Sequence, residues 1–144
     1  MGHAALDANT TADANTAFGS ATLTDNTTGA GNTAVGKDAL KANTTASDNV
    51  AVGLNALLTV TTAANNTAVG TSALKLNTGE ANTAVGRGAL LNNSTGVENT
   101  AVGKDALNDN TTGDNNVAVG RQALAVNTTA DDNVAVGDNA LQAN

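Results

Sequence analysis

Asn32-Thr33-Ala34-Val35-Gly36 is the stretch that decides the fold, because it returns almost unchanged along the whole chain. With its Asn as position 1, position 3 is always Ala, position 5 is always Gly, and position 4 is Val except at Phe18. The step between copies is 17 residues, except for one step of 16 between Asn66 and Asn82. Such a period predicts a repeat solenoid, in which each coil packs only on its neighbours. The other copies begin at Asn15, Asn49, Asn66, Asn82, Asn99, Asn116 and Asn133.

The remainder of the repeat is also regular. Positions 8 and 9 read Ala-Leu except at Thr22-Leu23, and position 12 is Asn except at Val60. Positions 13 to 17 form a turn such as Thr111-Thr112-Gly113-Asp114-Asn115. We therefore predict a single repeat domain over residues 1–144, with about eight coils and no divergent cap. Because solenoids normally need caps, we expect a piece of a longer array or ends that something covers. The predicted units are a partial coil 1–14, coils starting at residues 15, 32, 49, 66, 82, 99 and 116, and a partial last coil 133–144.

The composition excludes an ordinary globular core. The chain contains no Cys, Pro, Trp or Tyr and only one Phe, one Met and one His, although 40% of its residues are apolar. Aromatic side chains supply much of the burial in globular cores, whereas a stacked coil needs only a few small apolar residues. The net charge of −7 argues against binding to nucleic acid or to an anionic membrane surface. The apolar runs are too short for membrane insertion.

The pattern within the repeat predicts an all-β fold, a parallel β-roll or β-solenoid. β-Branched residues at positions 2 and 4 have the strand period, so positions 1 to 4 are predicted to form one strand. Gly at position 5 predicts a tight corner, positions 7 to 11 a second short strand, and positions 13 to 17 a looser turn. The recurrent glycine and turn leave no room for a helix of ordinary length.

In-register stacking places identical residues over one another, about 4.8 Å apart. Asn at positions 1 and 12 is then predicted to form side-chain amide ladders, as stacked Asn does in cross-β structure. The alternative is that Asn recurs only as a good turn residue. The predicted ladder residues at position 1 are Asn32, Asn49, Asn66, Asn82, Asn99, Asn116 and Asn133.

The apolar residues of the repeat are predicted to form a core and a subunit interface. Val at position 4 and Leu at position 9 are predicted to fill the thin core. By alternation, Ala at position 3 faces the other way, either into a tight interior or, as we favour, onto another subunit. The predicted core is Val35, Val52, Val69, Val85, Val102, Val119, Leu40, Leu57, Leu74, Leu90, Leu107 and Leu124. The predicted subunit interface is Ala34, Ala51, Ala68, Ala84, Ala101, Ala118 and Ala135.

No pattern of residues predicts catalysis, a cofactor or a metal site. The only His is His3, so neither a catalytic triad nor a His-based metal site is expected. Acidic residues gather in the turn over positions 13 to 17, but they do not recur in every coil as a calcium-binding repeat requires. Asn-x-Thr/Ser sequons are frequent, for example at Asn9, Asn26, Asn43, Asn110 and Asn127, and would matter only in a eukaryotic secreted protein. We expect the protein not to be an enzyme.

The motif Asn-[Thr/Val]-Ala-Val-Gly resembles the head repeats of trimeric autotransporter adhesins, whose signature is close to Ser-Val-Ala-Ile-Gly. It is also similar to the Asn-Thr-Ala-Val-Gly repeats of bacteriophage tail fibres. The resemblance covers nearly the whole chain and is carried by Ala34, Val35, Gly36 and their equivalents. It implies a left-handed β-roll with three chains around a common axis, located extracellularly on a cell surface or virion. The repeat here is longer than the typical adhesin repeat, so the turn geometry is expected to differ.

These features predict a structural and adhesive fibre module. We expect a homotrimer or end-to-end self-assembly, with a host or cell-surface ligand as a further partner. One alternative is an ice-binding solenoid, because flat Thr-bearing faces can match an ice lattice. Its candidate residues are the Thr side chains at positions 2, 13 and 14, although position 2 is Val in three coils. Another alternative is a filament subunit that stacks end to end through uncovered sheet edges.

Overall fold

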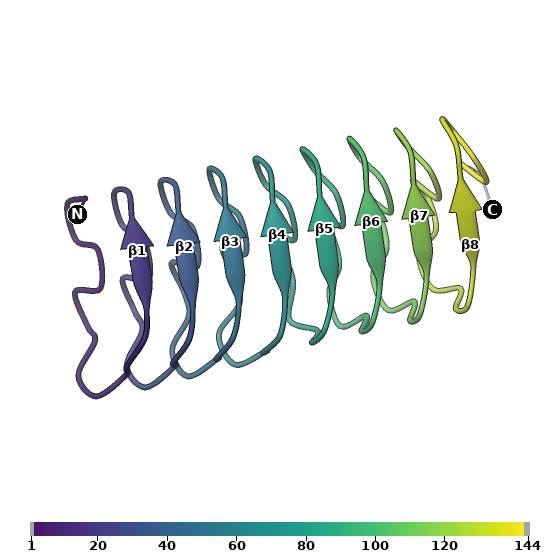
Figure 1. Ribbon diagram of the computed structural model, residues 1–144. Coiled ribbons are helices and arrows are strands. Elements are labelled where there is room, and N and C mark those ends of the chain that lie inside the picture. Colours follow the sequence, from purple (N-terminus) through teal and green to yellow (C-terminus); the bar gives the residue numbers. More distant parts are fainter. Residues whose placement is uncertain (1, 143–144) are drawn as a thin grey trace.

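The computed structural model describes residues 2–142 and shows one solenoid whose coils follow one another along a single axis (Figure 1). Every full coil contributes one three-residue strand at positions 2 to 4, and the eight strands form one parallel sheet in sequence order. The predicted all-β solenoid with a spacing of about 17 residues is therefore confirmed. The strands are β1 (Thr16–Phe18), β2 (Thr33–Val35), β3 (Val50–Val52), β4 (Thr67–Val69), β5 (Thr83–Val85), β6 (Thr100–Val102), β7 (Val117–Val119) and β8 (Val134–Val136).

The strands pair in register, so that each repeat position stacks on itself. Ala34 of β2 lies beside Ala51 of β3, and Val35 lies beside Val52. The one-residue-shorter step between Asn66 and Asn82 does not disturb this pairing, because Ala68 of β4 still lies beside Ala84 of β5. The missing residue is absorbed in the turn that joins the two strands.

The second strand predicted at positions 7 to 11 is wrong: these residues form turns. Asp38 at position 7 and Leu40 at position 9 both have positive φ, at 58° and 49°, and the same alternation recurs in the other coils. Left-handed residues two apart curl the chain and prevent an extended strand. Backbone hydrogen bonds still join successive coils here, for example from Leu40 N–H to the carbonyl of Ala56 (3.0 Å).

Glycine at position 5 is needed because the coils approach closely there. Gly36 has a φ of 129°, which L side chains rarely adopt, and a Cβ on it would lie 2.6 Å from the carbonyl oxygen of Gly53. The corner can therefore stack on the next corner only without a side chain. This requirement explains the invariance of position 5.

The interior of the coil is narrow and holds small or flat side chains. Ala34 at position 3, Ala39 at position 8 and Leu40 at position 9 are completely buried, as are Asn32 and Asn43. Leu at position 9 is therefore core, as predicted, and it is the largest side chain that recurs inside. Leu40, Leu57, Leu74, Leu90, Leu107 and Leu124 are all fully buried.

Candidate functional surfaces

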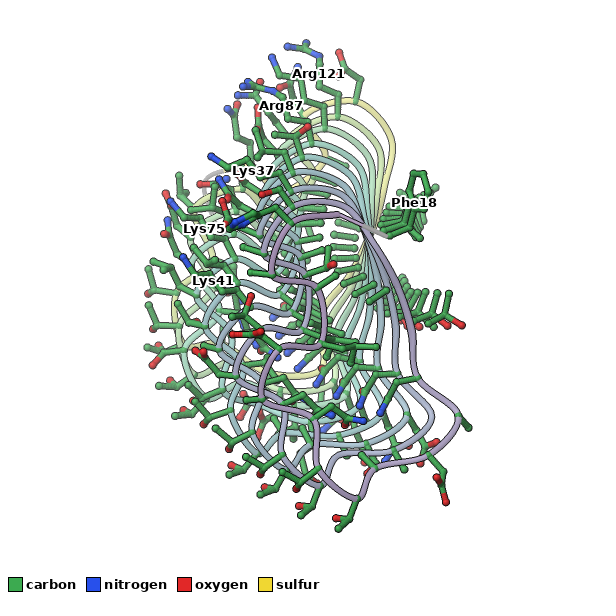
Figure 2. The ribbon with its side chains drawn as sticks, turned by 90° about the vertical axis from the view of Figure 1, so that its left-hand side faces the viewer. Phe18, Lys37, Lys41, Lys75, Arg87 and Arg121 are labelled. Carbon is green, nitrogen blue, oxygen red and sulfur yellow. The ribbon has the colours of Figure 1, made fainter. Side chains whose placement is uncertain are left out.

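The outer face of the sheet carries the side chains of positions 2 and 4. In Figure 2, Phe18 points away from the coil at this face, on the side opposite the labelled Lys and Arg residues. Phe18 is 67% exposed and Val136 is 69% exposed, while Val85 and Val102 in the middle of the rod remain more than one-third exposed. Because the strands pair in register, these side chains form two straight rows. We call this surface the sheet face: positions 2 and 4 of β1 to β8.

This arrangement overturns two sequence predictions. Val at position 4 is not core: Val35, Val52, Val69 and Val119 are half-buried, and Val85 and Val102 are exposed. The Ala residues at position 3 are not a subunit interface, because all of them lie inside their own coil. The exposed fraction is zero for Ala34, Ala51, Ala68, Ala84, Ala101 and Ala118, and 3% for Ala135.

The physical reason is the width of the interior. Leu from position 9 and Asn from positions 1 and 12 already lie inside the coil. Only a methyl group fits between them and the sheet, so Ala turns inward and its larger neighbours turn outward. Sequence reasoning missed the sheet face, although a column restricted to Ala beside two β-branched columns was the signal that could have identified it.

The Asn residues at position 1 join each coil to the next. The side-chain oxygen of Asn32 accepts a hydrogen bond from the backbone N–H of Asn49 (3.0 Å). Its side-chain nitrogen donates to the carbonyl of Ala46 (2.8 Å). A direct amide-to-amide bond occurs as well in the later coils, as from Asn116 Nδ2 to Asn99 Oδ1 (3.1 Å). The structure thus places Asn32, Asn49, Asn66, Asn82, Asn99, Asn116 and Asn133 in one continuous column along the rod.

The Asn residues at position 12 form a side-chain ladder in the stricter sense. Asn43 Nδ2 donates to Asn26 Oδ1 (2.8 Å) and also to the carbonyl of Ala46, three residues ahead (3.0 Å). The same pair of bonds recurs at Asn110, which donates to Asn93 and to Gly113. Both amide groups are buried, so each lost rung would leave a polar atom without water.

One rung of this ladder is missing. Val60 occupies position 12 after Asn43, and the buried Oδ1 of Asn43 has no hydrogen-bond partner. Val60 has no donor to offer it. The ladder resumes at Asn77, whose Oδ1 accepts from Asn93 Nδ2 (2.7 Å).

The basic residues lie along one edge of the coil (Figure 2), and five of the six form ion pairs with nearby acids. Asp38 lies within 3.5 Å of both Lys37 and Lys41, and Asp105 lies within 3.7 Å of both Arg87 and Lys104. These pairs are exposed, so each contributes little to stability. Their main effect is to balance charge along this edge.

Arg121 and Asp138 form the best-defined ion pair. Two parallel hydrogen bonds, 2.8 and 2.9 Å long, run from Nε and Nη2 of Arg121 to the two carboxylate oxygens of Asp138 in the next coil. These hydrogen bonds and the opposite charge of Arg121 lower the pKa of Asp138. The same hydrogen bonds, with the charge of Asp138, raise the pKa of Arg121.

The opposite edge, at positions 13 to 17, is purely acidic. It holds seven of the 13 acidic residues and no basic one, and the other six acids equal the six basic residues in number, so the net charge of −7 comes from this edge. Some of the carboxylates have structural roles: Asp114 Oδ1 accepts the backbone N–H of Val97 (2.8 Å). The residues are Asp13, Asp48, Glu80, Glu98, Asp114, Asp131 and Asp132.

Two features bear on chemistry. An open depression of about 360 Å³ lies beside Asp105, Asp109 and Gln122, lined mostly by carboxylate and amide groups. Within residues 2–142, no three His, Cys, Asp or Glu side chains come together as a group that could hold a metal ion. The sequons at Asn26, Asn43, Asn110 and Asn127 have buried Asn side chains, so the folded chain does not present them for glycosylation.

The described part of the chain has no helix with the length and apolar character that crossing a bilayer requires. No protein-family model matches this chain, and comparisons with curated proteins and with solved structures likewise find no match.

Proposed function

We propose that this chain is a non-enzymatic structural and adhesive fibre module that associates with copies of itself through the sheet face. The observation that carries the proposal is the apolar row at position 4, which faces outward along the whole sheet and is exposed at Phe18, Val85, Val102 and Val136. A soluble monomer rarely leaves a continuous apolar surface uncovered, and such surfaces mark sites of association. The regular register makes the surface flat, so that a second copy can pack on it over the length of the rod.

The charge distribution favours parallel association. The acidic turn precedes each strand and the charge-balanced edge follows it, so the two edges lie at opposite ends of the strands. Parallel chains that turn their sheet faces toward a common axis place the acidic edge of one beside the balanced edge of the next. An antiparallel pair with its two-fold axis along the strands would instead bring two acidic edges together. Like-charge contacts of this kind select against that arrangement.

The proposed number of chains is three. It is supported by the resemblance of the Asn-[Thr/Val]-Ala-Val-Gly motif to repeats of trimeric adhesin heads. In this arrangement Val and Phe at position 4 line the axis, and the variable positions 6, 7 and 10 face outward. The rod acts as a spacer at a cell surface or virion and presents repeated side chains, which allows weak contacts to add through avidity.

The test is the mass of the protein in solution, measured by light scattering with refractive-index detection because the chain lacks Trp and Tyr. We expect about three times 14.0 kDa. Val85→Glu, on the sheet face, should yield a folded monomer. Leu76→Glu is the matched control, because Leu76 is similarly exposed but lies outside the sheet face, at position 11. A monomeric unmodified protein, or equal effects of the two variants, would rule out the proposal.

Ice binding is a second candidate, favoured by one observation. The position 2 side chains, Thr in five coils, stand outward in a straight row on a flat sheet. The Thr hydroxyls at position 13 are less suitable, because several donate to the next coil, as from Thr44 to the carbonyl of Thr61 (3.1 Å). Thermal hysteresis of a monomeric protein would support ice binding, and its absence at high protein concentration would exclude it. Species far larger than a trimer would favour end-to-end stacking instead.

A further inference from the structure

The wall of the solenoid that contains positions 12 to 14 has an unusual junction between the third and fourth full coils. We call this junction the seam: the turn over residues 60–65 and the turn over residues 77–81. The two irregularities of the sequence coincide there, namely Val60 in place of Asn and the coil that is one residue short.

Elsewhere, successive turns are joined by many hydrogen bonds. The carbonyl of Thr111 accepts from the backbone N–H groups of Ser94 and Thr95 at 3.0 and 2.9 Å. Asn110 Nδ2 bonds to Asn93 Oδ1 (2.7 Å), and the backbone N–H of Val97 bonds to Asp114 Oδ1 (2.8 Å).

Across the seam, the described residues are joined by a single hydrogen bond, from Ala81 N–H to the carbonyl of Ala64 (3.2 Å). The rungs of positions 12, 13 and 14 are absent there. Neither Thr61 nor Thr62 donates its backbone N–H within residues 2–142, and both residues are exposed. At the preceding junction, between the second and third full coils, Val60 also leaves Asn43 Oδ1 buried without a partner.

The position 1 column changes at the same place. Asn32, Asn49 and Asn82 donate their side-chain N–H forward, to the carbonyl 14 residues ahead. Asn66 instead donates back to the carbonyls of Ala63 and Ala64, at 3.5 and 3.2 Å. The shortened turn therefore lacks the hydrogen bond that the position 1 side chain of its own coil supplies elsewhere.

The opposite wall is intact at the seam. The backbone N–H of Gly70 donates to the carbonyl of Val52 (2.7 Å), and β3 pairs with β4 in register. A solenoid whose turn wall is weak and whose sheet is continuous at one junction can open there with the sheet as a hinge.

We propose that the seam is where this rod opens first, and that it divides the solenoid into two cooperative units. In a repeat protein, stability is approximately a sum of coil terms and nearest-neighbour terms, so the weakest interface sets the boundary between units. A rod that must bend or be pulled then yields at one defined place.

Native-state hydrogen exchange of the unmodified protein tests the seam directly. The backbone N–H groups of Leu57 and Thr59, at positions 9 and 11 beside the seam, donate to the carbonyls of Ala73 and Lys75 in the next coil. Their matched counterparts are Leu107 and Asp109, which bond to Ala123 and Ala125 at an intact junction. We expect Leu57 and Thr59 to exchange at least about tenfold faster, the factor that corresponds to roughly one net hydrogen bond. Equal rates at the two junctions would overturn the proposal.

Two variants test whether the missing hydrogen bond at position 12 causes the faster exchange. Val60→Asn supplies the missing rung and should slow exchange at Leu57 and Thr59 toward the rates of Leu107 and Asp109. Asn110→Val copies the defect into an intact junction and should speed exchange at Leu107 and Asp109. If neither variant changes the ratio of the two rates, the missing rung is not the cause and the proposal fails. The comparison in the unmodified protein decides the question even if one variant does not fold.

Discussion

The buried side-chain oxygen of Asn43 faces the position that Val60 occupies in the next coil, and it therefore has no hydrogen-bond partner. Where two successive position 12 residues within residues 2–142 are both Asn, the Oδ1 of the first is bonded to the second, as Asn93 is to Asn110 (2.7 Å). A single apolar residue in a polar column thus converts a continuous ladder into two segments. An unsatisfied buried acceptor costs about 1–3 kcal/mol.

Val60→Asn should stabilise the protein. The new amide would bond to Asn43 Oδ1 and to the carbonyl of Ala63, following the pattern of Asn110, and these bonds outweigh the loss of a buried Val side chain. We expect a gain of about 1 kcal/mol in the free energy of unfolding. Chemical denaturation followed by far-ultraviolet circular dichroism measures it. A variant less stable than the parent would show that the orphaned oxygen is not a liability.

Ala84→Leu should be strongly destabilising, whereas Val85→Leu should be tolerated. The two residues are neighbours in β5, but Ala84 is fully buried in the narrow interior and Val85 is 38% exposed. Overpacking a filled interior costs about 1–3 kcal/mol or more, while exposed substitutions usually change stability by less than about 0.5 kcal/mol. Denaturation midpoints of both variants check this. A larger loss of stability in Val85→Leu than in Ala84→Leu would show that position 4, and not position 3, faces the interior.

Gly36→Ala should lower the free energy of unfolding by at least about 2 kcal/mol, through strain at positive φ and a clash with the corner of the next coil. Gly88→Asn is the matched control. Gly88 has a φ of 67°, and a Cβ there would meet only the ends of the Asp105 and Asn108 side chains and the Asp105 carboxyl carbon. Asn55 and Asn139 already adopt positive φ at the same repeat position. Thermal unfolding of both variants should separate them clearly; equal losses would refute the stacking explanation of position 5.

Arg121→Gln should raise the pKa of Asp138, because the two hydrogen bonds from Arg121 are the main cause of its lowered value. A carboxyl whose pKa is lowered on folding contributes stability above its ordinary pKa, and that contribution is lost as the pH falls through the lowered value. The pair is exposed, so the effect on overall stability should be small. Titration of the Asp138 carboxyl by NMR is the measurement. Lys104→Gln is the control: Lys104 pairs with Asp105 and should leave the Asp138 titration unchanged.

The sequence by itself determined the repeat, the parallel in-register stack, the corner at Gly36 and its equivalents, and the buried Leu40 column. Each of these follows from identical residues that recur at a fixed period. When coils of equal length stack in register, each repeat position lies over the same position of the next coil. The alternation of Thr33, Ala34 and Val35 also determined that two of them face one way and one the other.

Only the tertiary structure decided which of these side chains face the interior of the coil. Alternation defines two faces without saying which is interior, and the answer depends on how much space the opposite wall leaves. Leu40 and the Asn columns fill that space, so Ala34 points inward and Val35 outward. The turn at positions 7 to 11 was likewise beyond the pattern, because Leu40 at a φ of 49° is held there by stacking on its neighbours and not by its own preference. The seam depends on both: the sequence shows Val60 and the short coil, but only the tertiary structure shows that their hydrogen-bond losses fall on the same wall.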